Sequence, residues 1–200
     1  MSNYFSLSWT SPRQSANASA PNIKKAGHQL IADLEGLNEM PFDMHLIKIT
    51  VGRNELIYSD NLSGLKNIWD DYLGNDFAWP LMSEKLKSVI EKELTGEEGI
   101  DWISVKIHGN GECRTYYILR FNKELDVLDN EHTMFQPNSA RVIVPHFSLE
   151  KIKNYSVFTV PRPHCNYWKI TSNIKLSEKV KKAIQKAKIT AVSFSKTRVH

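Results

Sequence analysis

The residues best suited to nucleophilic chemistry in this 200-residue chain are its two cysteines and the histidines near them. Cys165 directly follows His164, and His146 lies upstream, so a cysteine–histidine enzyme is one interpretation. Neighbours on an extended segment point to opposite sides, however, and no nucleophile-elbow or cysteine-protease signature surrounds them. We therefore predict a loop histidine beside a buried thiol, and no catalytic residues.

A zinc site would require paired ligands at short spacing, such as two cysteines separated by two residues. His108 and Cys113 flank one predicted turn, and the pair at 164–165 lies far along the chain. Nothing in this spacing favours a four-ligand site. Gly109–Gly111 lacks the later glycine of a phosphate-binding loop and precedes a strand. We predict no metal ion, no cofactor and no enzymatic activity.

Four lysines recur at helical spacing near the C-terminus and predict one basic stripe: Lys175, Lys179, Lys182 and Lys186. Arg162, Tyr167 and Trp168 precede them and are residue types that contact nucleic acids. A small nucleic-acid-binding regulator that uses the basic C-terminal helix is therefore an alternative function. Lysines opposite an apolar stripe are more often an ordinary solvated helix surface, and we favour that interpretation.

Charge is distributed unevenly along the chain, although the formal net charge is only +4. From Glu55 to Asp101, eleven acidic residues stand against four lysines. From Thr171 to His200, eight basic residues stand against Glu178 alone. An acidic region that also carries aromatic side chains is typical of an interface rim that meets a basic partner.

Two segments are therefore predicted to contact a partner protein. The acidic region contributes Trp69, Asp70, Asp71, Asp76, Glu97 and Glu98. The proline-flanked segment 160–170 contributes Arg162, His164, Tyr167 and Trp168. If the acidic region forms the contact, charge reversal at Asp70, Asp71 and Asp76 should slow association, most strongly at low salt.

The surrounding pattern predicts an α+β domain with a mixed or antiparallel sheet and packed helices. Strands are expected at 3–9, 44–51 and 55–60, and a hairpin at 102–121 turns at Asn110-Gly111 with Ile103, Val105 and Ile107 on one face. The composition of 10–22 predicts a loop, and 23–36 and 63–74 predict short helices. No apolar run is long enough to span a membrane, and the N-terminus lacks the regions of a signal peptide, so a cytoplasmic protein is expected.

One decamer occurs twice, as SEKLKSVIEK at 83–92 and SEKVKKAIQK at 177–186. Ser83 and Ser177 are predicted N-caps, each followed by a glutamate in the first turn and by apolar residues at helical spacing. A strand-like run follows each copy, which gives a helix–strand pseudo-repeat at 83–107 and 177–195. The shared residues are those of a scaffold, and the pattern allows two pseudo-repeated halves.

The order of five phrases resembles that of bacterial immunity proteins of polymorphic toxin systems: WPLMSEKLKSVIE, IDWISVKI, RTYYILRFNKELDVLD, FSLEKIKNYSVFTV and LSEKVKKAIQKAKITAVSF. The resemblance covers about 42–194 within a single domain of 200 residues and leaves out the first forty. The chain resembles the immunity protein 43 family first, and the immunity protein 11 family, which has a similar layout, is the alternative.

The resemblance implies a cytoplasmic, non-catalytic protein that neutralises a cognate toxin domain by stoichiometric occlusion. The toxin would be the C-terminal domain of a large secreted protein, used in contact-dependent inhibition between neighbouring bacteria and bound in a 1:1 complex. No membrane partner and no nucleic acid are expected. The resemblance supplies no binding residues, so the candidate contacts remain those named above.

Overall fold

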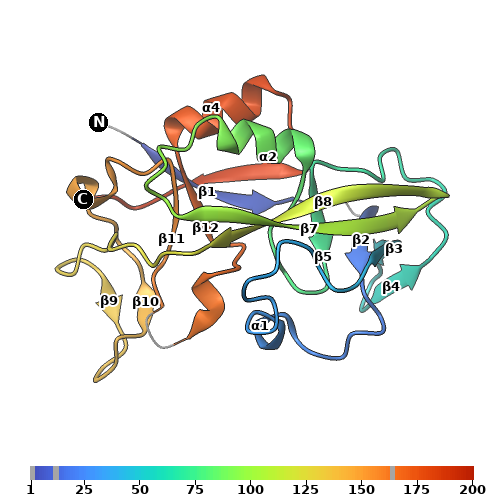
Figure 1. Ribbon diagram of the computed structural model, residues 1–200, viewed down its shortest axis with the longest axis horizontal. Helices are drawn as coiled ribbons and strands as arrows, with labels where there is room; N and C mark the ends of the chain where they lie inside the picture. Colours follow the sequence, from blue (N-terminus) through green and yellow to red (C-terminus); the bar gives the residue numbers. More distant parts are fainter. Residues whose placement is uncertain (1–2, 11–13, 163–164) are drawn as a thin grey trace.

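The chain forms a mostly β structure, shown in Figure 1 as a computed structural model that describes residues 3–10, 14–162 and 165–200. Its strands are β1 (Tyr4–Trp9), β2 (Gln14–Ser19), β3 (Met44–Val51), β4 (Leu56–Ser59), β5 (Tyr72–Asn75), β6 (Leu81–Ser83), β7 (Ile100–Gly109), β8 (Glu112–Phe121), β9 (Met134–Phe135), β10 (Val142–Val144), β11 (Val157–Thr159), β12 (Ile174–Ser177) and β13 (Val192–Lys196). The helices are α1 (Gly27–Leu30), α2 (Glu84–Glu91), α3 (Leu149–Ile152), α4 (Glu178–Lys186) and the 3₁₀ helix η1 (Asn166–Trp168).

Six of these strands close into a barrel in the order β2-β5-β6-β8-β7-β3, because β2 pairs with both β5 and β3. The β2–β5 and β3–β7 pairs are parallel and the other pairs antiparallel, while β4 is attached to β3 outside the ring. Ile103, Val105 and Ile107 point into the barrel core, as their alternation predicts. The predicted α+β class with a mixed sheet is confirmed in outline, and closure into a barrel is an additional feature of the structure.

The hairpin β7–β8 turns at Asn110 and Gly111, whose φ angles are 50° and 77°. Asparagine and glycine tolerate this left-handed region, and two such residues in succession match the right-handed twist of the flanking strands. The predicted hairpin is therefore confirmed, with the turn at the predicted residues.

A second, antiparallel sheet has the order β11-β12-β1-β13, with the predicted N-terminal strand β1 between β12 and β13. Helices α2 and α4 lie side by side along the upper side of the molecule in Figure 1. One buried cluster joins these helices to both sheets: Leu7, Leu86, Ile90, Leu119, Phe121, Ile174, Val180 and Ile184. The barrel and the second sheet therefore share a hydrophobic core.

The repeated decamer forms two similar helix starts. The Ser83 and Ser177 hydroxyls accept hydrogen bonds from the backbone N–H groups of Leu86 and Val180, at 3.1 and 3.5 Å. Helix α2 connects β6 to β7, which run parallel with the antiparallel strand β8 between them. Helix α4 connects β12 to β13 in the same way, with β1 between them. The predicted caps are confirmed. Because one unit belongs to the barrel and the other to the open sheet, the structure does not show two repeated halves.

Two local predictions are wrong. Part of the predicted loop 10–22 is β2, whose small side chains, including Ala16 and Ala18, are buried in the barrel. Residues 63–74 do not form a helix, because the Asn67 side chain accepts a hydrogen bond from the Trp69 N–H at 3.2 Å and Tyr72 starts β5. Side-chain bonds of this kind compete with helical backbone bonds.

Candidate functional site

Among the described cysteine and histidine candidates, His108 and Cys113 do not form an activated pair. Cys113 Sγ lies 4.0 Å from His108 Nε2, and Asp43 Oδ2 lies 2.7 Å from the same nitrogen. Since one nitrogen faces both groups, His108 cannot accept the thiol proton while it donates to Asp43. Among the residues that the structure describes, no group of three or more His, Cys, Asp or Glu is arranged to hold a metal ion. His164, next to Cys165, lies outside the described residues.

The predicted basic stripe is not continuous on the surface. Lys175 lies in β12 and is only 7% exposed. Lys179 forms an ion pair with Glu93 at 2.8 Å, and Lys182 forms one with Glu178 at 3.0 Å. The prediction of a four-lysine helical stripe is wrong, because α4 begins only after β12 and the first lysine faces the interior. This arrangement weakens the case for nucleic-acid binding.

Burial of Lys175 gives a testable pH dependence. Its Nζ donates to Ser6 Oγ at 2.7 Å and to Asn173 Oδ1 at 2.6 Å, and burial lowers the pKa of its amine from 10.5 to about 8. Between these values the unfolded chain binds more protons than the folded chain, so stability rises with pH. From pH 7 to 9 we expect this group to add about 1 kcal/mol to the free energy of unfolding.

Urea denaturation at pH 7 and pH 9 checks this expectation. Lys175→Met should lack the increase, whereas Lys182→Met, at a residue whose side chain is 72% exposed, should retain it. The same increase in all three proteins would contradict the assignment.

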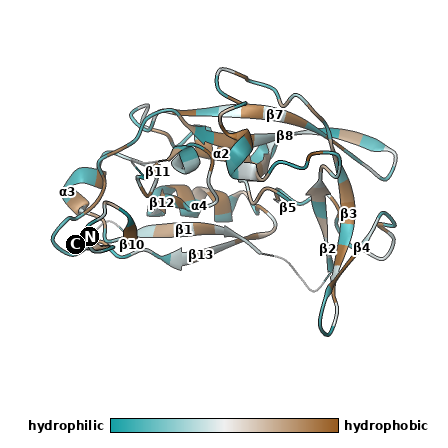
Figure 2. Ribbon diagram, turned by 90° about the horizontal axis from the view of Figure 1, so that it is seen from below, coloured by the Kyte–Doolittle hydropathy of each residue, from teal (hydrophilic) through white to brown (hydrophobic). Residues whose placement is uncertain are grey.

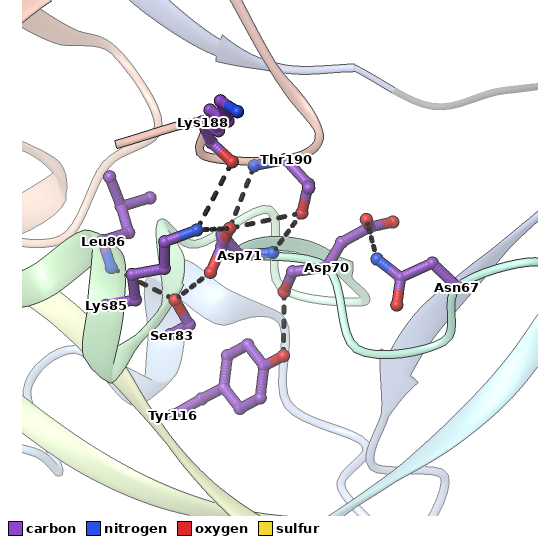
Figure 3. A network of polar contacts seen from close by, with 9 residues as sticks. All are labelled: Asn67, Asp70, Asp71, Ser83, Lys85, Leu86, Tyr116, Lys188 and Thr190. Atoms are coloured by element: carbon purple, nitrogen blue, oxygen red, sulfur yellow. Dashed lines mark hydrogen bonds and ion pairs between the residues drawn. The ribbon is translucent and has the colours of Figure 1, made fainter. Parts of the chain in front are cut away.

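Asp71 is part of a junction between the start of α2 and the segment that follows α4, shown in Figure 3. Its carboxylate accepts hydrogen bonds from Ser83 Oγ at 2.7 Å and from the Thr190 backbone N–H at 3.0 Å. Lys85 Nζ lies 3.6 Å from the same carboxylate, and the Asp71 side chain is 13% exposed. These contacts connect the start of α2 to the segment between α4 and β13, so the side chain has a structural role.

The prediction of Glu98 as a surface contact is wrong, because this residue is only 1% exposed. Its carboxylate accepts hydrogen bonds from the backbone N–H groups of Thr95, Gly96 and Ser156, at 2.8 to 3.1 Å. Burial acts to raise the pKa of Glu98, but these backbone donors outweigh it and lower the pKa overall. The adjacent Glu97 is exposed.

Asp76 and Trp168 also make contacts within the fold. Asp76 is exposed, but its carboxylate accepts hydrogen bonds from Ser19 Oγ at 2.5 Å and from the Ala20 backbone N–H at 3.3 Å. Trp168 is half-buried and packs against the core shared by the two sheets. The nine candidate contacts within the described residues therefore do not lie on one surface.

Most exposed large apolar side chains of the described residues fall into two groups, and Trp9 and Leu37 belong to neither. On β3 and β4 they are Val51, Leu56, Ile57 and Tyr58. On β9, β10 and η1 they are Met134, Ile143 and Tyr167. Figures 1 and 2 place β4 and β10 at opposite ends of the long axis. Clustered exposed apolar residues mark sites of protein contact, so each end is a candidate.

At the β4 end, Trp69 lines a hollow of about 570 Å³ together with Asp60, Lys66 and Glu112. The Arg114 guanidinium lies 4.7 Å from the centre of the Trp69 ring. We call this the Trp69 hollow. Its described charged residues carry both signs.

Asp70, the neighbour of Trp69, is less firmly held than Asp71. Its carboxylate accepts a hydrogen bond from Asn67 Nδ2 at 2.6 Å, and its backbone carbonyl accepts one from the Tyr116 hydroxyl at 2.8 Å (Figure 3). A change of the Asp70 side chain would therefore disturb one local contact and leave the bond from Tyr116 in place.

At the β10 end, a hollow of about 640 Å³ lies between the β9–β10 hairpin and the segment after β11. We call it the Arg162 hollow, and its lining includes Arg141, Ile143, Pro161, Arg162, Tyr167 and Asn173. Two of the predicted contacts, Arg162 and Tyr167, are therefore together in one concave surface.

Sequence reasoning missed the other side of the Arg162 hollow. Arg141 and Ile143 lie about twenty positions before Arg162, on the β9–β10 hairpin. The signal in the sequence is the phrase ARVIVP at 140–145, which by itself indicates only a short extended segment. Its exposed arginine and isoleucine become site candidates once the hairpin is placed beside 160–162.

No helix in the described part of the chain is long and apolar enough to cross a membrane. No curated protein matches the chain. The model of the immunity protein family Imm11 matches residues 56–199, which include both hollows, and this is the second of the two families that the sequence resembles. Because the match spans most of its length, the chain belongs to the Imm11 immunity protein family.

Proposed function

We propose that this protein binds the toxic domain of a cognate bacterial toxin in a 1:1 complex and neutralises it by occlusion, without chemistry of its own. Its place would be the cytoplasm of a cell exposed to toxins from neighbouring bacteria, and the toxic domain would be the C-terminal part of a large secreted protein. Membership of an immunity protein family is the observation that carries this proposal.

We place the toxin contact at the Arg162 hollow. Ile143 and Met134 are 56% and 57% exposed and Tyr167 is 40% exposed, so an apolar surface adjoins a concave one. Tyrosine and arginine are enriched among the residues that contribute most to binding energy, and they do so in partly enclosed positions. The Arg162 hollow combines both residue types with the apolar surface.

A pull-down of the tagged protein from its native host tests the function. We expect mass spectrometry to identify one toxin domain, at a one-to-one ratio and retained in high salt. Recovery of nucleic acid alone, released by salt, would contradict the proposal and support the nucleic-acid alternative.

Matched substitutions at the two ends test the placement. Ile143→Asp puts a charge beside the Arg162 hollow, and Ile57→Asp puts the same charge on β4, where the isoleucine is 50% exposed. We expect Ile143→Asp to weaken toxin binding at least tenfold, about 1.4 kcal/mol or more, and Ile57→Asp to leave it within twofold.

The opposite result would move the contact to the β4 end. Loss of binding on Asp70→Lys or Glu97→Lys, measured as a slower association rate, would instead support contact through the acidic region. Thermal melting of each variant shows whether the fold is intact.

A further inference from the structure

We propose that the Arg162 hollow recognises carboxylate groups on an extended acidic segment of the partner protein. This inference rests on the proposed function and specifies the chemistry of the toxin segment at that surface. The inference predicts an acidic partner surface at this hollow. The acidic region of the sequence, by contrast, would favour a basic partner.

The charge of the described lining residues is the first argument. Arg141 and Arg162 are both exposed and both line the hollow, and no aspartate or glutamate is among the described lining residues. Neither guanidinium has an ion-pair partner among the residues that the structure describes. Within the described chain Arg53 and Arg198 also lack an ion pair, so the feature that sets Arg141 and Arg162 apart is that they share one hollow whose described lining has no carboxylate.

The backbone of both arginines is held by hydrogen bonds, while their side chains are exposed. The Arg141 carbonyl accepts a hydrogen bond from the Gln136 N–H at 2.8 Å, and the Arg141 N–H donates to Ser139 Oγ at 3.1 Å. The Arg162 carbonyl accepts from the Cys165 N–H at 3.1 Å. The backbone that carries the two side chains is therefore ordered before a partner binds, which reduces the backbone part of the entropy cost of binding.

A third cation lies behind the hollow. Asn173 lines it, and the Asn173 side-chain oxygen accepts a hydrogen bond from Lys175 Nζ at 2.6 Å. The contact holds the Asn173 amide and puts a positive charge next to this lining residue. Together the three cations make this surface attractive to anions, and the guanidinium fork matches the two oxygens of a carboxylate.

The apolar surroundings favour a protein segment over a nucleic acid. Val142, Ile143, Pro145 and Pro161 line the hollow, and Tyr167 is the aromatic residue among its described lining. Surfaces for single-stranded nucleic acid combine a track of cations with several stacking aromatic rings. A glutamate- or aspartate-bearing strand with apolar side chains matches this lining better.

Fluorescence anisotropy with a labelled peptide of alternating glutamate and valine tests the inference, with a glutamine–valine peptide and a single-stranded oligonucleotide of equal length as comparisons. The test variant is Arg141→Glu with Arg162→Glu. The matched control is Arg53→Glu with Lys66→Glu, which makes the same change in charge at exposed positions near β4. The binding is measured at low salt, because at 0.1 M salt attraction between exposed charges is already screened beyond about 10 Å.

We expect the glutamate peptide to bind the unmodified protein, and its dissociation constant to rise at least tenfold in the test variant and less than twofold in the control. An Arg141→Lys, Arg162→Lys variant should lie between them, because the charge remains and the fork is lost. Equal loss in test and control variants, equal binding of the glutamine peptide, or tighter arginine-dependent binding of the oligonucleotide would each overturn the inference.

The toxin captured from the host separates this inference from the proposed function. Unchanged toxin binding by the Arg141→Glu, Arg162→Glu variant would overturn the inference and leave the function standing. Arginine-dependent peptide binding without any toxin in the pull-down would contradict the function and leave the carboxylate site standing.

Discussion

Replacing Glu98 with alanine is expected to lower the free energy of unfolding by about 3 kcal/mol, because buried backbone donors lose a charged acceptor. The Thr95, Gly96 and Ser156 N–H groups all donate to this carboxylate. These bonds fix the turn between α2 and β7 and connect it to the start of β11. Urea denaturation followed by tryptophan fluorescence gives the change directly.

The matched control is the neighbouring Glu97→Ala, at an exposed residue, for which we expect a change within about 0.5 kcal/mol. A pH series adds a second test with Glu98→Gln. Because the pKa of Glu98 is lowered in the folded state, its contribution is fully present above about pH 4.5 and is lost as pH falls through the folded value. The difference between the unmodified protein and Glu98→Gln should therefore shrink below pH 4.5, and a constant difference would contradict the assignment.

Replacing Asp71 with alanine is expected to lower the free energy of unfolding by about 2 to 3 kcal/mol. The substitution removes the acceptor of the Ser83 hydroxyl and of the Thr190 N–H, and it leaves Lys85 without its carboxylate (Figure 3). The start of α2 and the segment after α4 would lose the connection made by this carboxylate, and the bond from Lys85 Nζ to the Lys188 carbonyl at 3.4 Å would remain. Hydrogen exchange should increase first at residues 188–191, where this connection is made.

Asp70→Ala provides the comparison, because within the described chain the Asp70 carboxylate accepts only the local hydrogen bond from Asn67. We expect a change below about 1 kcal/mol for it, and a clear difference between the two aspartates. Equal destabilisation by both substitutions would show that the Asp71 junction is not the source of the effect.

The features that the sequence predicted depend on neighbouring residues. The turn at Asn110-Gly111 and the caps at Ser83 and Ser177 use backbone preferences and side-chain bonds within a few residues, so the local phrase is sufficient. Barrel closure depends on β2, which pairs with β3 and β5 although its composition is that of a loop. No local pattern specifies such a long-range pairing.

Long-range contacts also decide which of the predicted contact residues are exposed and which are buried. Glu97 and Glu98 are adjacent and chemically identical in the sequence, yet one is exposed and the other is buried, because Ser156 of a distant segment supplies a backbone donor. Arg162 and Tyr167 were named from residue type, and they share a hollow with residues of the β9–β10 hairpin. Only the fold shows that Arg141 belongs with them.

The most direct test of the account is a titration of the captured toxin domain with this protein, with toxin activity measured after each addition. Stoichiometric occlusion predicts that activity falls linearly and reaches its minimum at one equivalent, with no further change over time. It also predicts recovery of active toxin when the complex is separated. Progressive and irreversible loss of activity at a small fraction of one equivalent would show turnover, and would contradict a non-catalytic immunity protein.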